Sequence, residues 1–443
     1  MNEAVVILAA GKGTRMQSCL PKVLHQLCGK PIISYVLEVA KASEATEIIV
    51  VLPKENQEIK EVIGSSVSYC TQEKALGTAD ALLSAQSLLK GYNDVIVLSG
   101  DVPLVSADLL SSLITKHHET NSSITLVTAD VKNPDGLGRV IRNNNGSIST
   151  IVEQIDATGD ELAIGEINAG IYMFEASWLW NSLPKLPRAK SGEVYLTSLI
   201  HSAALDNKDM ATVKVNDEYE VLGINNQIQL SIAENYMREK INMKFMLNGV
   251  TIPDPKTVYI DTDVTISTGT IIKPNTHLLG KSIIAGRSEI GPNTVVRNAT
   301  VGIQCKIESS YVFDSHIGNG VSIGPFSNVR SNTTLAKGVR VGNFVEIKNS
   351  KVAENTRILH HSYIGDAEIG KNVNIGAGTI TCNFDGVTKN HTKIGDEAFI
   401  GSNTMIVAPL KIGIGSKTGA GSVITSDVPD GATVIGVPAR IKT

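Results

Sequence analysis

The first residues able to do chemistry lie in a glycine-rich segment near the amino terminus, residues 8–16 (LAAGKGTRM). Glycines at such a turn let backbone N–H groups approach phosphate oxygens closely. Arg15 and Lys22 add two cations to the same region. The segment lacks the last glycine of a dinucleotide fingerprint and has no Walker G-K-[ST], so neither of those nucleotide sites is predicted. We expect a phosphate site of another kind; the glycines alone also fit a structural strand-to-helix turn.

An aspartate suited to a metal follows another apolar run, in residues 100–104 (GDVPL). A carboxylate directly after a buried strand is well placed to hold Mg²⁺ bound to phosphates. Asn225 offers a second oxygen ligand much further along the chain. Asp101 and Asn225 also fit the turn roles that such residues commonly take. Because ligands bind beyond the carboxyl ends of strands in α/β sheets, the loops at Gly11 and Gly100 should share one crevice.

A histidine and a glutamate, His360 and Glu346, are the candidates for proton transfer in the second half. A base of this kind, oriented by a carboxylate, suits acyl transfer. His361 is a second candidate by position, and either ring also fits a plain surface histidine. Residues 376–386 are followed by a break in the local repeat, which predicts an extruded loop and often marks the working face of a solenoid.

The element that must position these residues is a repeat of six. A small aliphatic residue recurs at Ile317, Ile323, Val329, Leu335 and Val341, and glycine often follows it. Neither an α-helix nor a half-buried strand has this period. Three short flat faces per turn do have it, with the aliphatic residue pointing inward, so the pattern predicts a parallel β-helix of roughly eighteen residues per coil.

The first half alternates short apolar runs with longer mixed stretches. Ala4–Ala10, Ile48–Leu52 and Val95–Leu98 are predicted strands, and Ile32–Ala42 and Thr78–Leu89 are predicted helices. The alternation favours a mostly parallel α/β sheet with helices on both faces. An amphipathic stretch then leads to the stop signal Asn248-Gly249. We expect domains at 1–226 and 251–443, joined by a helical arm at 227–250.

The composition indicates which kinds of partner and which cellular compartment to expect. A net charge of −4 with both signs dispersed predicts no nucleic-acid surface and no anionic membrane partner. The 5 cysteines are scattered without a C-x-x-C pair, which favours a reducing compartment over disulfides or zinc. The short apolar run near the start reads as a buried strand, not a signal peptide or membrane span. We expect a cytoplasmic protein.

Motifs along nearly the whole chain resemble one family, the bacterial bifunctional N-acetylglucosamine-1-phosphate uridyltransferase/glucosamine-1-phosphate acetyltransferases. The matching segments are residues 8–16, 21–25 (PKVLH), 76–78 (LGT), 100–104, 136–139 (GLGR), 151–153 (IVE), 166–170 (EINAG), 223–226 (GINN), 346–348 (EIK), 360–366 (HHSYIGD) and 372–383 (NVNIGAGTITCN). The resemblance implies a Rossmann-like nucleotidyltransferase domain followed by a left-handed parallel β-helix. It also implies synthesis of UDP-N-acetylglucosamine, a cell-wall and lipopolysaccharide precursor.

The resemblance implies roles for residues of the first half. Those that would hold UTP are Leu8, Ala9, Ala10, Gly11, Gln72, Gly77, Thr78, Ser99 and Gly100, with Arg15 and Lys22 facing its phosphates as catalytic cations. Gly138, Glu153 and Asn168 would hold N-acetylglucosamine-1-phosphate, and Asp101 and Asn225 would bind Mg²⁺. The nucleophile is an already anionic phosphate oxygen, so charge and alignment limit the reaction and no general base is needed. Ser99 and Gln227 stand where relatives often carry tyrosine and arginine.

The resemblance also implies an acetyltransferase site in the second half. His360 would be the general base toward the amine of glucosamine-1-phosphate, assisted by Glu346, because a protonated amine is a poor nucleophile. The residues that would bind the sugar phosphate are Arg330, Lys348, Tyr363, Asn374 and Lys389, and those that would line the acetyl-CoA site are Asn383, Phe384, Ser402 and Ala420. Phe384 replaces a common tyrosine.

One chain is not expected to complete the acetyl site. Arg330 and Asn374 lie about two coils apart at the repeat length, so packed prisms must bring such groups together. We therefore expect a homotrimer with acetyltransferase sites at subunit seams. Two alternatives stay open: another sugar-nucleotide pyrophosphorylase whose β-helix regulates or assembles, and a β-helix that serves only as a trimerisation scaffold. The motif at 372–383, with His360 and Lys389, argues against the first alternative.

Overall fold

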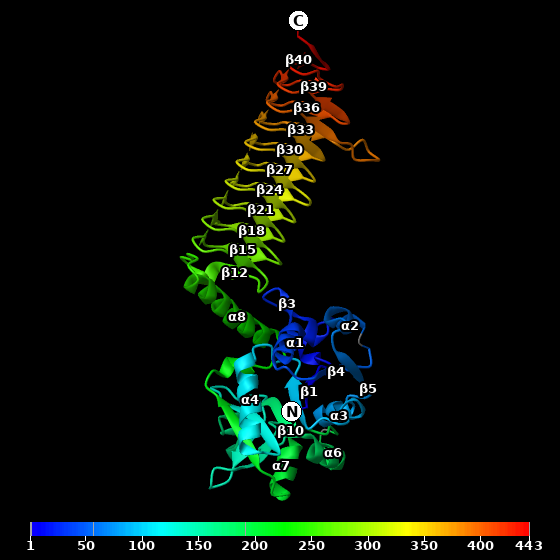
Figure 1. Ribbon diagram of the computed structural model, residues 1–443, viewed down its shortest axis with the longest axis vertical. Helices are drawn as coiled ribbons and strands as arrows, with labels where there is room; N and C mark the ends of the chain where they lie inside the picture. The colour runs from blue at the N-terminus through cyan, green and yellow to red at the C-terminus, as the bar shows by residue number, and fades with distance from the viewer. Residues whose placement is uncertain (1, 56, 191, 443) are drawn as a thin grey trace. The chain divides into compact units, whose positions relative to one another are not determined.

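The computed structural model describes residues 2–55, 57–190 and 192–442 (Figure 1). The chain divides into two compact units, Met1–Met237 and Arg238–Thr443. The division falls inside helix α8, Gln227–Leu247, which coincides with the stretch predicted to form the helical arm. No helix of the described residues is both long and apolar enough to cross a membrane.

The first unit is built on a mixed sheet. Its strands run in the order β11 (Met210–Val215), β7 (Ile124–Asp130), β10 (Glu166–Glu175), β6 (Asp94–Ser99), β1 (Glu3–Leu8), β4 (Glu47–Pro53) and β5 (Ser68–Gln72). The predicted apolar runs are the parallel strands β1, β4 and β6. Strand β10 is antiparallel to both of its neighbours, and the pair β8 (Arg139–Arg142) and β9 (Ile148–Val152) branches from it.

Helices cover this sheet, as the alternation of segments predicted. They are α1 (Ile32–Ala42), α2 (Gln57–Ile63), α3 (Thr78–Leu83), α4 (Ala107–Thr120), α5 (Gly159–Leu162), α6 (Ala176–Ser182) and α7 (Ser198–Leu205). Two separate apolar clusters form, one containing α3, α6 and α7 side chains and the other α1 and α4 side chains. The helix expected at Thr78–Leu89 ends at Leu83 and gives way to a 3₁₀ turn at Gln86–Leu88. The Ser84 hydroxyl donates to the Asp80 carbonyl at 3.0 Å at that point, a contact that competes with helix continuation.

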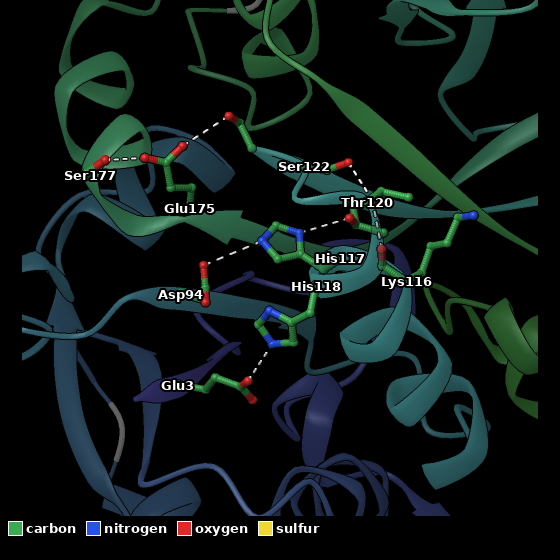
Figure 2. Close-up of polar contacts among 11 residues, drawn as sticks. Glu3, Asp94, Lys116, His117, His118, Thr120, Ser122, Glu175 and Ser177 are labelled. Carbon is green, nitrogen blue, oxygen red and sulfur yellow. Dashed lines mark hydrogen bonds and ion pairs between the residues drawn. The ribbon is translucent and has the colours of Figure 1, made fainter. Parts of the chain in front are cut away.

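At the amino ends of β1 and β6, three carboxylates lie in one row across the sheet. Glu3 pairs with Asp94, and Asp94 pairs with Glu175 on antiparallel β10. The carboxyl end of α4 places two histidines against this row (Figure 2). His117 Nε2 lies 3.5 Å from Asp94 Oδ1, and His118 Nε2 lies 2.8 Å from Glu3 Oε1. The two imidazoles therefore contact the edge of the sheet that lies opposite to the loops of the predicted phosphate site.

The second unit confirms the hexapeptide prediction. In residues 258–424 the strands form three parallel sheets, and consecutive strands of the chain fall on successive sheets (Figure 1). The last two strands, β40 (Thr433–Gly436) and β41 (Ala439–Ile441), form an antiparallel pair at the edge of one of these sheets. The fold is a left-handed parallel β-helix. The aliphatic residues of the repeat, such as Ile317, Leu335 and Ile364, are fully buried inside the prism. Burial stabilises each such side chain by roughly 1.5–3 kcal/mol relative to exposure.

Glycine after the aliphatic residue is required where one coil touches the next. A Cβ placed on Gly342 would lie 2.0 Å from the carbonyl oxygen of Leu359, and one on Gly376 would lie 2.5 Å from the nitrogen of Ser402. Contacts that short do not occur between real atoms, so a side chain there would force neighbouring coils apart. Glycine therefore sets the stacking distance of the coils at these positions.

The predicted extruded loop leaves the prism after strand β33 (Ile380–Cys382) (Figure 1). A bridge between Phe384 and Lys389 closes its base. Asp385 accepts hydrogen bonds from the backbone nitrogens of Val387 and Thr388 at 2.8 and 2.7 Å, which organise its tip. These hydrogen bonds hold the pKa of Asp385 far below its ordinary value. The interruption is thus a structured loop on a regular prism.

Candidate functional sites

The loops after β1 and β6 meet at the carboxyl edge of the sheet, as the α/β pattern predicted. Leu8 and Ser99 are register partners, and the Gly100 nitrogen donates to the Leu8 carbonyl at 2.9 Å. Ala9 extends the same edge by donating to the Val51 carbonyl at 2.9 Å. A Cβ on Gly11 would meet nothing within 4 Å, so this glycine faces open space. Residues 8–11 therefore present backbone to a space that a ligand can enter.

Four side chains predicted to handle phosphates and metal converge beside these loops. Lys22 Nζ donates to Asp101 Oδ2 and, at 3.1 Å, to Asn225 Oδ1. Arg15 Nη2 donates to the same Asn225 oxygen at 2.9 Å. Residues more than 200 positions apart in the chain thus share one polar cluster. The Ile224 nitrogen fixes the segment before helix α8 by donating to the Asp101 carbonyl at 2.9 Å.

This cluster fits a divalent cation. Asp101 and Asn225 both direct an oxygen at one ammonium group, so the two oxygens can converge on one cation. Oxygen donors suit Mg²⁺, which is usually held by one or two protein groups together with substrate phosphates and water. Among the described residues no set of three or more His, Cys, Asp or Glu side chains could form a metal site. Any Mg²⁺ here would therefore depend on phosphate oxygens for most of its ligands.

The segment that contains Gln72, Gly77 and Thr78, which is predicted to hold UTP, is fixed by contacts within the protein. Buried Gln72 donates through Nε2 to the Gly77 carbonyl at 3.0 Å. Gly77 has φ +111°, and a Cβ there would lie 2.4 Å from the Val194 carbonyl oxygen, so glycine is required. Thr78 Oγ1 accepts from the Leu196 nitrogen at 2.9 Å. Gln72 and Thr78 are therefore partly engaged by the protein itself, which fixes the loop between them.

The three residues predicted to hold the sugar also lie together. The Asn168 nitrogen donates to the Gly138 carbonyl at 2.9 Å, and a Cβ on Gly138 would lie 3.5 Å from the Glu153 carboxylate oxygens. Glu153 Oε1 accepts from Thr197 Oγ1 at 2.9 Å. Burial raises the pKa of Glu153, which outweighs the lowering effect of the Thr197 hydrogen bond. A half-buried carboxylate with spare acceptor capacity is suited to neutral sugar hydroxyls.

Ser99 and Gln227, the two positions expected to differ from the family pattern, make contacts within the protein. Ser99 Oγ donates to the Gly170 carbonyl at 3.2 Å, and Gln227 Nε2 donates to the Met16 carbonyl at 3.1 Å. Both contacts tie segments of the first unit together around the predicted nucleotide site.

In the second unit, one face of the prism gathers most residues predicted to bind the sugar phosphate. Strands β24 (Asn328–Arg330), β27 (Glu346–Lys348) and β30 (Tyr363–Gly365) stack in parallel, with Arg330 paired to Lys348 and Glu346 to Tyr363. Arg330 Nη2 and Glu346 Oε1 form an ion pair at 2.9 Å. Glu346 therefore lies with Arg330 on this face.

The extruded loop adds Lys389 and Asn383 to this face, around a carboxylate that sequence reasoning left out of the site. Asp366 accepts hydrogen bonds from Asn349 and from buried Asn383. Burial raises the pKa of Asp366, but these two hydrogen bonds and the positive charges of Lys348 and Lys389 bring it below its ordinary value. Asp366 lies within the matched motif 360–366. Its place in that motif, next to the coil that carries the extruded loop, is the sequence feature that could have identified it.

The same face holds two ammonium groups close together. Contact with Lys348 lowers the pKa of Lys389. Like charges held in one place disfavour ionisation unless an anion compensates them. The exposed ammonium group of Lys389 is accessible to an anion from solvent, although Asp366 already offsets part of this positive charge.

His360 and Asn374 lie on a different sheet of the prism. Strands β26 (Arg340–Asn343), β29 (Arg357–His360) and β32 (Asn374–Ile375) stack in that sheet. His360 ends β29 and is exposed, just before the corner that leads to Tyr363. Among the described residues no hydrogen bond or ion pair joins His360 to Glu346, whose carboxylate contacts Arg330 instead. Within one chain, His360 and Asn374 share one face, and the predicted phosphate ligands Arg330, Lys348 and Tyr363 lie on an adjacent face.

The residues predicted to line the acetyl-CoA site lie higher on the prism. Ser402 and Ala420 follow β35 (Phe399–Ile400) and β38 (Lys417–Thr418) on successive coils, and both are exposed. The Gly421 nitrogen donates to the Ser402 carbonyl at 2.8 Å, which stacks the two corners. Phe384 is 60% exposed on the extruded loop. An exposed row of this kind can accept a long ligand running along the prism.

The fold and these sites define a class of transferase. A family model described as nucleotidyl transferase matches residues 4–223, and one described as bacterial transferase hexapeptide (six repeats) matches residues 314–349. Curated relatives carry the name bifunctional protein GlmU. That of Syntrophomonas wolfei is 42% identical over 97% of this chain and 96% of its own length. That of Carboxydothermus hydrogenoformans is 43% identical over 97% and 96%, and that of Clostridium novyi 41% over 100% and 97%.

The chain belongs to this family of bifunctional GlmU proteins. The resemblance stated from the motifs is confirmed, as is the prediction of an enzyme with a nucleotidyltransferase domain and a hexapeptide transferase domain. The individual site residues and the subunit arrangement stay predictions.

Proposed function

We propose that this protein makes UDP-N-acetylglucosamine in two steps. The second unit transfers an acetyl group from acetyl-CoA to glucosamine-1-phosphate, and the first unit transfers a uridylyl group from UTP to N-acetylglucosamine-1-phosphate with release of pyrophosphate. The observation that carries the proposal is the presence of two chemically different sites. A cluster of cations and oxygen ligands lies in the first unit, and a histidine with an anion site lies in the second.

In uridylyl transfer, the chain's task is alignment and charge compensation. Arg15 and Lys22 face the triphosphate, where they offset the repulsion between its oxygens and the attacking sugar phosphate. Gly138, Glu153 and Asn168 orient the sugar so that its phosphate oxygen points at the α-phosphorus. Asp101 and Asn225 would hold Mg²⁺, which supplies further neutralisation of phosphate charge when bound. Lys22 then exchanges its contact with Asp101 for phosphate oxygens.

In acetyl transfer, the chain must provide a base. Lys348 and Lys389, with Arg330, Tyr363 and Asn374, hold the sugar phosphate. His360 removes a proton from the substrate amine, whose nitrogen attacks the thioester carbonyl and expels the CoA thiolate. The exposed ring of His360 is accessible to an amine from solvent. Asn383, Phe384, Ser402 and Ala420 line the path of acetyl-CoA, and Glu346 assists through the charge it places near the site.

We further propose a homotrimer in the cytoplasm. The separation of His360 and Arg330 on adjacent faces of one prism supports a site completed by a neighbouring copy. UTP and acetyl-CoA are intracellular metabolites, and the 5 cysteines are scattered along the sequence without a C-x-x-C pair, which suits a reducing compartment.

The test is a reaction with glucosamine-1-phosphate, acetyl-CoA, UTP and Mg²⁺, analysed for products with each ingredient omitted in turn. Omission of UTP should leave N-acetylglucosamine-1-phosphate and free CoA. Omission of acetyl-CoA should leave glucosamine-1-phosphate unchanged, and added N-acetylglucosamine-1-phosphate should then restore pyrophosphate release. Absence of thiol release from the complete mixture would favour a scaffold role for the β-helix. Selective formation of a different sugar nucleotide would favour another pyrophosphorylase.

A further inference from the structure

Arg139 is a buried arginine held by neutral groups. Its side chain is only 1% exposed, and it is among the largest fully buried side chains of the described residues. Within residues 57–190, Nη1 donates to the Leu137 carbonyl and Nη2 donates to Gln154 Oε1 at 3.3 Å, whereas Nε has no partner. Burial of a charge is costly unless it is paired and hydrogen-bonded. The burial of the Arg139 guanidinium among neutral acceptors therefore calls for an explanation other than an ion pair.

The guanidinium closes a small network around one loop. Gln154 Oε1, which accepts from Arg139, also accepts from the Gly136 nitrogen. Arg139 thus ties the loop of residues 136–138 to the segment that follows strand β9. Because a guanidinium donates from a rigid planar fork, it fixes both the distance and the orientation of its two acceptors.

This network borders all three residues predicted to hold the sugar. Gly138 lies between Leu137 and Arg139, and Glu153 directly precedes Gln154. Asn168 follows Ile167, which is the register partner of Arg139. The Asn168 nitrogen also donates to the Gly138 carbonyl at 2.9 Å. A displacement of Arg139 would therefore move each side of the sugar site at once.

We propose that Arg139 is a positioning residue for the sugar phosphate in uridylyl transfer, acting through the 136–138 loop and Gln154. The inference rests on the proposed function of the first unit. Arg139 does not touch the substrate, because its guanidinium is buried beneath the loop. The UTP side of the site is braced by separate contacts of Gln72, Gly77 and Thr78. Loss of Arg139 should therefore weaken sugar-phosphate use and spare UTP.

The experiment measures KM for each substrate from pyrophosphate release by the full-length chain. Arg139→Met should raise the KM for N-acetylglucosamine-1-phosphate about tenfold or more, while the KM for UTP stays within about twofold, because misplaced binding groups act on the ligand they orient. Arg139→Lys should recover only part of the loss, because an ammonium cannot span both acceptors. Acetyl transfer by the same samples should be unchanged, which reports on the integrity of the rest of the chain.

Arg142→Met is the matched control on the same strand. Arg142 is exposed and binds Glu166 through Nε and Nη2 at 2.8 and 2.7 Å and the Gly146 carbonyl at 2.9 Å, away from the 136–138 loop. Its removal should leave both KM values within about twofold of the wild type. A sugar KM that rises as much in Arg142→Met as in Arg139→Met would show a general effect of losing an arginine from β8 and would overturn the inference.

Gln154→Leu keeps the test decisive if Arg139→Met fails to fold. The substitution removes the acceptor of both Arg139 and Gly136 at a half-buried position and should reproduce the selective rise in the sugar KM. Equal rises for both substrates, or unchanged values, in these variants would refute the positioning role while the wild type stays active. A wild-type chain that releases no pyrophosphate from UTP and N-acetylglucosamine-1-phosphate would instead refute the proposed function, and this inference with it.

Discussion

At the scale of single residues, two carboxylates in the two sites have opposite environments. Glu153 accepts one hydrogen bond and its pKa is raised by burial. Asp366 is held by two amides near two lysines, and the net effect lowers its pKa. The ionised form of Glu153 is thus a cost that binding a sugar would offset, whereas the charge of Asp366 is already compensated by the protein.

Glu153→Gln should stabilise the first unit at neutral pH while it impairs sugar binding. A folded-state pKa above the unfolded value means that the carboxyl's contribution to stability is fully present below the unfolded pKa and is lost as pH rises through the folded pKa. Glutamine removes this loss, so the melting temperature should rise at pH 7 and the difference should shrink toward pH 4. Melting curves at both pH values, with the KM for N-acetylglucosamine-1-phosphate, measure the two effects.

Glu161→Gln is the control of opposite sign. Hydrogen bonds from the Thr158 backbone and hydroxyl lower the pKa of exposed Glu161, as in a capping box. Its stabilising contribution is present above the unfolded pKa and is lost in acid, so the substitution should lower the melting temperature at neutral pH. A lower melting temperature for Glu153→Gln at pH 7 would contradict our account of its burial.

At the scale of elements, sequence patterns predicted what local periodicity encodes. Helix α1 has the predicted bounds Ile32–Ala42, and the strands at β1, β4 and β6 differ from prediction by one or two residues at their ends. The antiparallel insertion of β10 was missed, because an apolar run reads the same in either direction. The Gln154–Arg139 network was missed for a similar reason, since an arginine in a strand-like run gives no sign of its burial.

His117 gives a stability prediction for the edge of the sheet in Figure 2. His117 is 3% exposed, and its Nδ1 lies 2.8 Å from Thr125 Oγ1 while Nε2 faces Asp94. His117→Leu should lower the free energy of unfolding by about 1–3 kcal/mol, because Thr125 and Asp94 lose their partner in a buried setting. Chemical denaturation of the full chain, followed through the first unit's transition, measures it.

His118→Leu is the matched comparison on the next residue. His118 contacts Glu3 at 2.8 Å but is more exposed, so water can replace the imidazole and the loss should be smaller. If His118→Leu lowered the free energy of unfolding as much as His117→Leu or more, burial would not determine which of these two contacts stabilises the fold more. Neither change should alter the KM values of uridylyl transfer, since both residues lie at the opposite edge of the sheet.

At the scale of the whole molecule, the sequence revealed the prism but not how its faces are used. The hexapeptide period places aliphatic residues inward and the polar motif residues from 330 to 389 outward, but it does not say on which outer face each of them lies. The structure distributes them between two sheets, with His360 and Asn374 on one and Arg330, Lys348 and Tyr363 on the other. The repeat length predicted that Arg330 and Asn374 lie about two coils apart, and a homotrimer that brings such groups together stays a prediction.

Mixed assemblies test the proposed sharing of the acetyl site. His360→Ala and Lys348→Ala chains should each lose nearly all thiol release from acetyl-CoA when produced alone. Co-expressed and purified through two different tags, they should regain a measurable part of the wild-type rate, because some seams then receive an intact residue from each chain. Mixing the separately folded proteins without exchange is the control and should restore nothing. Failure of the co-expressed pair to exceed that control would place the whole site within one chain.

The central claim is that one chain carries two independent chemistries, and a pair of substitutions measured in both assays tests it most directly. Asp101→Ala should lower pyrophosphate release about 100-fold or more and leave thiol release within about twofold, because it removes a proposed carboxylate ligand of the Mg²⁺ that neutralises phosphate charge. His360→Ala should do the reverse, by removal of the base. Loss of both activities in either variant, or full thiol release by His360→Ala, would contradict the account.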